Sequence, residues 1–62
     1  MEKNLTVIGY TAALGDLIRL ATITNQQAIE ALSGAGLSKG LLVKAGVEQI
    51  DMDAIYPPEA ES

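Results

Sequence analysis

Apolar residues at helical spacing run along the first third of the chain. Between residues 11 and 21 they recur at intervals of three and four, which places their side chains on one face of a helix. The positions that form this face are Ala13, Leu14, Leu17, Ile18 and Ala21. Gly15 weakens a helix by about 1 kcal/mol relative to alanine, so the segment predicts either one helix or two short ones. The β-branched run Thr22-Ile23-Thr24 then interrupts the pattern.

Two more helices are indicated by residues that cap helix ends. Thr24 followed by Gln27 is a capping-box pattern, because the threonine hydroxyl accepts an N–H while the glutamine reaches back. This pattern predicts a helix over residues 25–33. The residues expected on its inner side are Ala28, Ala31 and Leu32. A break at residues 33–36 follows, where glycine supplies the positive φ that a helix end often needs.

The segment after this break admits two interpretations. Ser38 is a predicted N-cap for a helix over residues 39–45, and Gly46 is its predicted stop. Residues 49–54, however, alternate polar and apolar with period two, which is typical of a strand. A hairpin that turns around residues 45–46 satisfies the alternation, and so does a short helix followed by an extended tail.

The chain is expected to form one domain over residues 1–56 and a flexible acidic tail over residues 57–62. Pro57-Pro58 ends any regular element, and the last four residues are expected to fray. A domain in a chain of 62 residues buries only about 60% of its unfolded surface. It is therefore marginal alone, and a partner or a homodimer is expected.

The net charge of −4 is spread unevenly along the chain. Residues 1–47 hold four bases against three acids, a net charge of +1, whereas residues 48–62 hold five acids and no base. Charged side chains interrupt every apolar stretch that approaches about 18 residues, so no transmembrane helix is expected. We expect a cytoplasmic protein whose acidic end keeps a small apolar domain in solution.

The residue types weigh against catalysis. There is no cysteine for a disulfide, a nucleophile or a zinc site, and no histidine to move protons near neutral pH. Asp16, Asp51 and Asp53 are candidates for paired carboxylates, but acids in a strongly acidic tail such as residues 48–62 are usually only solvated. Gly34-Ala35-Gly36 resembles a fragment of a phosphate-binding loop. It lacks both the hydrophobic strand that precedes such a loop and the Gly-Lys-Ser/Thr sequence that ends it. We expect no enzyme, no cofactor and no metal.

Short helices joined by tight turns suit a helix-turn-helix unit, whose second helix lies in the DNA major groove. Two placements of this unit on the chain are possible. In the first register residues 17–21 form the supporting helix and residues 25–32 the helix that contacts bases, where glutamine amides are available to pair with adenine. In the second register residues 28–35 form the supporting helix and residues 38–45 the helix that contacts bases, with Gly36 in the turn. The first has Thr22-Ile23 where glycine is usual, and the second has a glycine inside its supporting helix.

Three short segments carry a resemblance to a known family. They are Met1-Glu2-Lys3-Asn4-Leu5-Thr6-Val7-Ile8-Gly9-Tyr10 followed by Gly15, Gln26-Gln27-Ala28-Ile29, and Ile55-Tyr56-Pro57-Pro58-Glu59. The first resembles the opening of small Cro repressors from lambdoid phages. The second is similar to the start of the recognition helix in Cro-like and related antitoxin-type regulators, and the third to the tail of several of them. The resemblance implies a cytoplasmic operator-binding repressor, dimeric on DNA, with Gln26 and Gln27 at base edges and Lys39 near the backbone.

We therefore expect a mainly α, compact helix-turn-helix domain of the lambda-repressor-like kind, with three to four short helices. The alternative is an α+β Cro-type domain with a C-terminal β-hairpin. The predicted DNA-binding residues are Asn25, Gln26, Gln27, Ser38, Lys39, Lys44 and Arg19. Four bases are few for this function, because affinity for DNA rests largely on lysine and arginine neutralising phosphates.

The competing hypothesis is a small acidic protein–protein interaction module or inhibitor that binds a protein partner and not DNA. The helical stripe Leu14, Leu17, Ile18 and Ala21 would then be partly interface, although ordinary core is its commoner role. Residues 26–27 would serve helix capping and solvent contact. Cations gathered on one face favour DNA, whereas dispersed cations favour the protein module.

Overall fold

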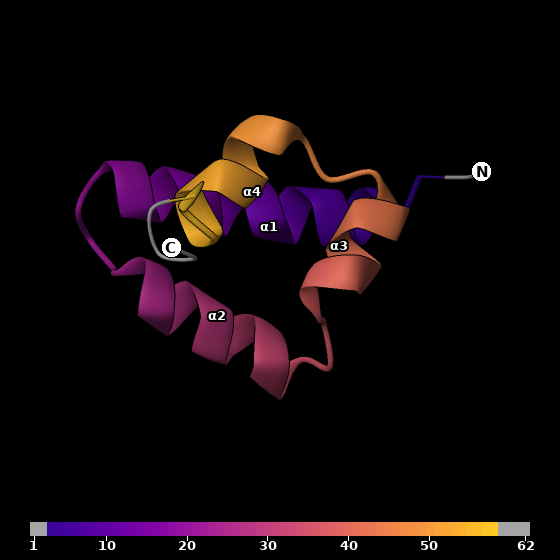
Figure 1. The fold of residues 1–62 in the computed structure, drawn as a ribbon, viewed down its shortest axis with the longest axis horizontal. Helices are drawn as coiled ribbons and strands as arrows, with labels where there is room; N and C mark the ends of the chain where they lie inside the picture. The colour runs from indigo at the N-terminus through magenta and orange to yellow at the C-terminus, as the bar shows by residue number, and fades with distance from the viewer. Residues whose placement is uncertain (1–2, 59–62) are drawn as a thin grey trace.

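The computed structural model describes residues 3–58 and contains, within them, four α-helices and no strand (Figure 1). The helices are α1 (Leu5–Arg19), α2 (Asn25–Gly34), α3 (Lys39–Ala45) and α4 (Gln49–Ile55). The mainly α class is thus confirmed, and the hairpin alternative is wrong for these residues. None of the described helices is long and apolar enough to cross a membrane.

Helix α1 starts well before the predicted helix and continues through Gly15 without a break. Asn4 caps its first turn, because the Asn4 Oδ1 accepts a hydrogen bond of 3.1 Å from the Val7 N–H. Thr11 is fully buried, and its hydroxyl donates 2.7 Å to the Val7 carbonyl oxygen. The buried hydroxyl is therefore satisfied by a hydrogen bond to the backbone of its own helix.

The inner face of α1 differs from the predicted one. Leu14 is buried and Ile18 is half-buried, as expected, whereas Ala13 and Leu17 are exposed and Ala21 lies beyond the end of the helix. The actual inner face is turned toward Thr11 and Gly15, which face the helices that pack on α1. The predicted face therefore combines apolar residues that lie on two different sides of the helix.

The predicted caps of α2 and α3 are confirmed. Both hydrogen bonds of the capping box between Thr24 and Gln27 are present at the start of α2. Ser38 caps α3, and Gly46 ends it with a φ of +94°. Gly36 has a φ of +79° in the turn after α2, a conformation that side chains other than glycine rarely adopt. In α2, Ala28 and Leu32 are buried as predicted, but Ala31 is exposed.

The segment with strand-like alternation is helix α4, so both the hairpin and the extended tail after α3 are wrong there. Met52 and Ile55, three residues apart, are buried, whereas Ile50 is 62% exposed. The period-two pattern was incidental over six residues, and burial follows the helical period instead. The helix ends at Ile55, before Pro57, as predicted. Residues 59–62 of the predicted tail lie outside the described residues.

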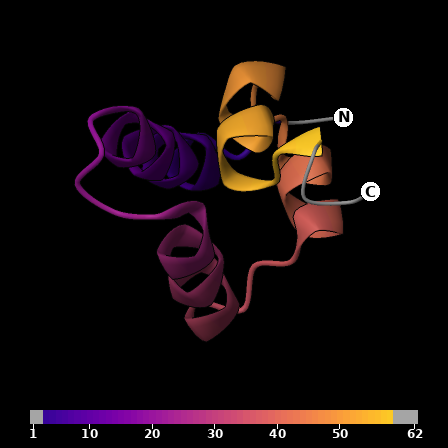
Figure 2. The same cartoon turned by 60° about the vertical axis from the view of Figure 1, so that its left-hand side comes forward.

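Helix α1 is the centre of the packing, because it contacts α2, α3 and α4, while α4 also contacts α2 (Figures 1 and 2). The buried apolar residues that join them are Leu14, Ala28, Leu32, Leu42, Met52 and Ile55. The core is aliphatic, as the composition predicts. A backbone bond of 2.9 Å from the Asn4 N–H to the Ala45 carbonyl oxygen ties the end of α3 to the start of α1.

Candidate functional site

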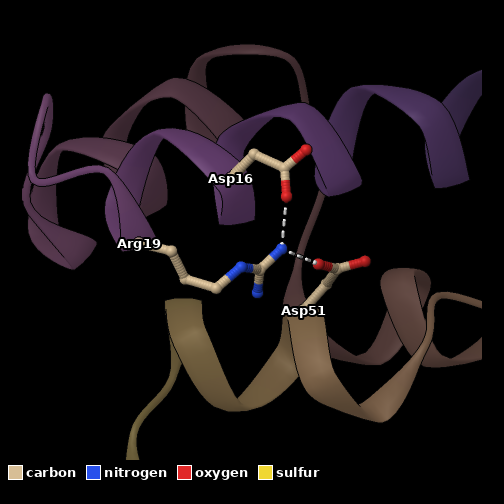
Figure 3. Close-up of polar contacts among 3 residues, drawn as sticks. All are labelled: Asp16, Arg19 and Asp51. Carbon is tan, nitrogen blue, oxygen red and sulfur yellow. Dashed lines mark hydrogen bonds and ion pairs between the residues drawn. The ribbon is translucent and has the colours of Figure 1, made fainter.

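Arg19, a predicted DNA contact, is held by two carboxylates in the fold (Figure 3). Its Nη2 atom bonds to Asp16 on α1 and, at 3.1 Å, to Asp51 Oδ1 on α4. The Asp51 side chain is only 4% exposed, whereas that of Asp16 is 68% exposed. The hydrogen bonds that Arg19 donates to Asp16 and to Asp51 raise the pKa of Arg19, and its positive charge faces these two carboxylates.

The candidate paired carboxylates make separate contacts in the structure. Asp16 and Asp51 share one guanidinium nitrogen, and Asp53 instead accepts a hydrogen bond of 2.8 Å from Gln49 Nε2. The first pair joins α1 to α4, and the second bond lies within α4. Only the bond between Arg19 and Asp51 joins two helices, and the three acids do not converge on one site.

Sequence reasoning missed the buried role of Asp51, and one signal in α1 pointed to it. A Cβ on Gly15 would lie 2.6 Å from Asp51 Oδ1, so a side chain at this position would displace the Asp51 carboxylate. A glycine inside an apolar helix, four residues before an arginine, indicates such a close approach of a second element.

The predicted base-reading amides at the start of α2 are mostly engaged within the fold. Gln27 Oε1 accepts a hydrogen bond of 2.9 Å from the Thr24 N–H, as part of the capping box. Asn25 Nδ2 donates 3.4 Å to the Ile55 carbonyl oxygen and joins α2 to the end of α4. Gln26 is exposed in the first turn of α2. Of the three amides, Gln26 is the one turned toward solvent without a structural role.

The predicted residues of α3 lie at both of its ends. Ser38 Oγ accepts a hydrogen bond of 3.3 Å from the Leu41 N–H, which makes it the N-cap. Lys39 Nζ lies 5.3 Å from the centre of the Tyr56 ring, a cation–π contact between α3 and the residue after α4. Lys44 is exposed in the last turn.

These residues do not form one surface. Asn25, Gln26 and Gln27 begin α2, whereas Ser38 and Lys39 follow its other end. The side chains of Asn25 and Lys39 nevertheless both reach the end of α4, at Ile55 and Tyr56. Arg19 ends α1, while Lys44 lies beside the start of α1, where Ala45 bonds to Asn4. The cations are dispersed over the molecule, the arrangement that favours a protein-binding module.

The outward side of α1 carries uncharged side chains in one line, which we call the outer stripe. Its members are Thr6, Tyr10, Ala13, Leu17 and Leu20. All five residues are exposed, and the exposed fraction is 40% for Tyr10, 36% for Leu17 and 74% for Leu20. The other described helices pack on different sides of α1 (Figure 2). Apolar side chains in a continuous exposed row are typical of an interaction site.

A second feature is a groove of about 290 Å³ between α3 and α4, which we call the α3–α4 groove. It is lined by Lys39, Val43, Gln49, Met52, Asp53, Tyr56 and Pro58. Apolar surface from Val43 and Met52 is flanked by an ammonium group and a carboxylate. The sequence did not predict this groove, because residues 49–56 were not expected to fold back beside α3 as a helix.

Comparison with known proteins gave no match to a protein-family model, to a curated protein or to a solved structure. The resemblance to Cro-like repressors therefore stays a prediction.

Proposed function

We propose that this chain is a small protein-interaction module that binds a short apolar segment of a partner polypeptide in the α3–α4 groove. The observation that supports this proposal is the lining of the groove. Val43, Met52 and Tyr56 provide apolar surface, while Lys39 and Asp53 provide a donor and an acceptor at its edge. Recognition sites typically combine mostly apolar walls with a few placed polar groups.

The size of the groove favours part of a larger partner over a free small molecule. Its volume of about 290 Å³ lies just below the roughly 300–1,000 Å³ typical of small-molecule sites. An extended polypeptide can place one or two side chains in such a groove and direct its backbone groups to the rim. There Lys39 donates to a carbonyl oxygen and Asp53 accepts from an N–H.

The rim is held in place by contacts within the protein. The cation–π contact fixes Lys39 over Tyr56, and the hydrogen bond from Gln49 fixes Asp53. Polar groups that are already oriented lose less conformational entropy when a partner binds. The groove is therefore suited to recognise a segment by a small number of contacts.

The test is a selection of binders from a displayed random-peptide library, followed by titration of selected peptides against two variants. Val43 and Ile50 are both 62% exposed, but only Val43 lines the groove. We expect Val43→Lys to weaken peptide binding at least tenfold and Ile50→Lys to leave it unchanged. Failure to select any peptide, or equal binding by both variants and the original chain, would overturn the proposal.

DNA binding is the second candidate, and one observation favours it. Helix α2, a turn containing Gly36 and helix α3 follow one another with the spacing of the second helix-turn-helix register. Against it, α2 and α3 make few contacts with each other, and Arg19 is bonded to carboxylates. A helix-turn-helix unit depends on the packing of its two helices.

A gel shift with random DNA fragments at low ionic strength tests this candidate. If DNA is bound, Lys39→Ala should weaken all sequences about equally and flatten the salt dependence. Gln26→Ala should leave base preference unchanged, because in this register α3 and not α2 lies in the major groove. Absence of a shifted band at low salt, or a shift insensitive to salt, excludes this function.

A further inference from the structure

The α3–α4 groove has two different ends. The start of α3 lies near the end of α4, because Lys39 Nζ is 5.3 Å from the centre of the Tyr56 ring. The other ends of the two helices are separated by only three residues, 46–48. The groove therefore runs from Lys39 and Tyr56, which we call the Tyr56 end, to the start of α4, which we call the Gln49 end.

The Gln49 end carries two carboxylates. Glu48, the N-cap of α4, is exposed and makes no capping hydrogen bond with its side chain. Asp53 lies one turn after Gln49 and lines the groove, where its Oδ1 accepts a hydrogen bond of 2.8 Å from Gln49 Nε2. Within residues 3–58 neither carboxylate forms an ion pair. The neutral amide orients Asp53 but leaves its negative charge in place.

The cations nearest to these carboxylates in the chain are directed elsewhere. Arg19 is bonded to Asp51, which faces α1. Asp53 is two positions further along α4 and therefore points in nearly the opposite direction from Asp51. Lys44 follows Val43, and because successive residues of a helix point about 100° apart, it does not line the groove.

The two remaining lysines are also accounted for by the fold. Lys39 lies at the Tyr56 end, with its ammonium group over the aromatic ring. Lys3 lies on the side of α1, where its Cγ is 3.0 Å from the position of a Cβ on Gly46, beside Ile8. The negative charge of the Gln49 end is therefore left for a partner to neutralise.

We infer that the partner segment carries a lysine or an arginine within about three positions of its apolar anchor, a specification that rests on the proposed function of the groove. The apolar side chain packs on Val43 and Met52. The ammonium or guanidinium group donates to Asp53, the residue after Met52 on α4. In an extended segment, residues two positions apart point to the same side about 7 Å from each other, which is close to one helical turn.

The charges of the whole chain favour a basic segment over an acidic one. The net charge is −4, and residues 48–62 hold five acids and no base. An acidic segment, or a nucleic acid, would meet the ammonium group of Lys39, but it would also bring negative charge beside Asp53 and Glu48. A basic segment is attracted by both carboxylates, and complementary charges of this kind raise the association rate and the specificity of a complex.

Selection from the displayed random-peptide library at two ionic strengths is the first test. At low salt we expect the selected sequences to be enriched in lysine and arginine close to an apolar residue, relative to the unselected library. At about 0.5 M salt this enrichment should fall, because the Debye length is then only about 4 Å. Selected peptides that depend on Val43 but carry no excess of basic residues would overturn this inference and leave the proposed function standing. Failure to select any peptide would overturn both.

The variant Asp53→Asn tests the carboxylate itself. Its amide oxygen can still accept the hydrogen bond from Gln49, so the variant loses the charge and keeps the shape. It should bind a selected basic peptide about two- to fivefold more weakly at low salt. Glu30→Gln is the matched control, because it changes the net charge equally from an exposed position on α2. Circular dichroism of both variants checks the fold, and equal affinities of the two variants contradict the inference.

A change in the peptide completes the test. A selected peptide is synthesised with its basic residue and with glutamine in that place, and both forms are titrated against the original chain and Asp53→Asn. If the cation pairs with this carboxylate, the glutamine form should bind the two proteins equally, whereas the basic form should distinguish them. A basic residue whose replacement weakens binding to both proteins by the same factor acts elsewhere, and this result would refute the assignment to Asp53.

Discussion

At the residue scale, Gly15 and Asp51 depend on each other across the contact of α1 with α4. The buried carboxylate of Asp51 occupies the space that a side chain at Gly15 would need, and from there it bonds to Arg19. A carboxylate with so little exposure is stable only while its charged partner is in place. The glycine thus contributes to the fold through the room it leaves and not through flexibility.

Alanine substitutions in α1 separate these two effects of glycine. Gly9→Ala should raise the free energy of unfolding by up to about 1 kcal/mol, because alanine favours helix and the space is open. Gly15→Ala should lower it by roughly 1–2 kcal/mol, since overpacking displaces Asp51 from Arg19. Urea unfolding followed by circular dichroism measures both. Equal stabilisation by the two substitutions would contradict the close approach.

The capping box gives a second prediction at this scale. Thr24→Ala should lower the free energy of unfolding by about 1 kcal/mol, because the Gln27 N–H loses its acceptor at the start of α2. Gln27→Ala should lower the free energy of unfolding by less than Thr24→Ala does, because it removes only the second bond of the box. Gln26→Ala, at the exposed neighbouring position, should change it by less than about 0.5 kcal/mol. Urea titration of the three variants checks the order, and an effect at Gln26 as large as at Thr24 would argue against the box.

Residue patterns of this local kind could be predicted from the sequence. The caps at Thr24 and Ser38 and the stop at Gly46 depend on groups only a few positions apart. The bond between Arg19 and Asp51 spans 32 positions, and no local rule pairs them. For the same reason Arg19 was assigned to DNA, whereas its partner is on a helix that the sequence had not predicted.

At the element scale, two features misled sequence reasoning. Helix α1 has apolar side chains on an inner face and on the outer stripe, and both recur at helical spacing. The pattern therefore predicts the helix but not which side is buried, because that depends on where α2 and α4 pack. In α4 six residues satisfy period two, and the helical period is only visible when Ile55 is included.

Substitutions in α4 distinguish its helical burial from the rejected strand. In a strand Ile50 and Met52 would share a face, and truncation of either would have a similar cost. In the helix Met52 is buried and Ile50 is exposed. Met52→Ala should lower the free energy of unfolding by about 2–3 kcal/mol, and Ile50→Ala by less than about 0.5 kcal/mol. Comparable losses in urea unfolding would favour the strand.

At the scale of the whole molecule, the core is small for the number of apolar side chains. Within residues 3–58 six apolar residues are buried, while seven large ones are exposed. The exposed set is Leu5, Tyr10, Leu17, Leu20, Leu41, Val43 and Ile50. A domain of this size has little stability to spare. A partner that covers Val43 in the α3–α4 groove would remove part of this set from water and add to the stability of the fold.

This coupling predicts that a bound peptide raises thermal stability. A peptide present at about 100 times its dissociation constant stabilises the folded state by about 2.7 kcal/mol. For a domain this small each kcal/mol raises the Tm by about 4–8 °C. The Tm should therefore rise by at least about 10 °C when a selected peptide saturates the groove. Differential scanning calorimetry with and without the peptide measures the rise.

Val43→Lys should remove this rise, whereas Ile50→Lys should keep it, because only Val43 lines the groove. Without peptide, the Tm of Val43→Lys should be close to that of the original chain, since Val43 is exposed. This comparison separates lost binding from a damaged core, because core damage lowers the Tm with and without peptide. A Tm of the original chain that does not change when a selected peptide is added would contradict binding in the groove.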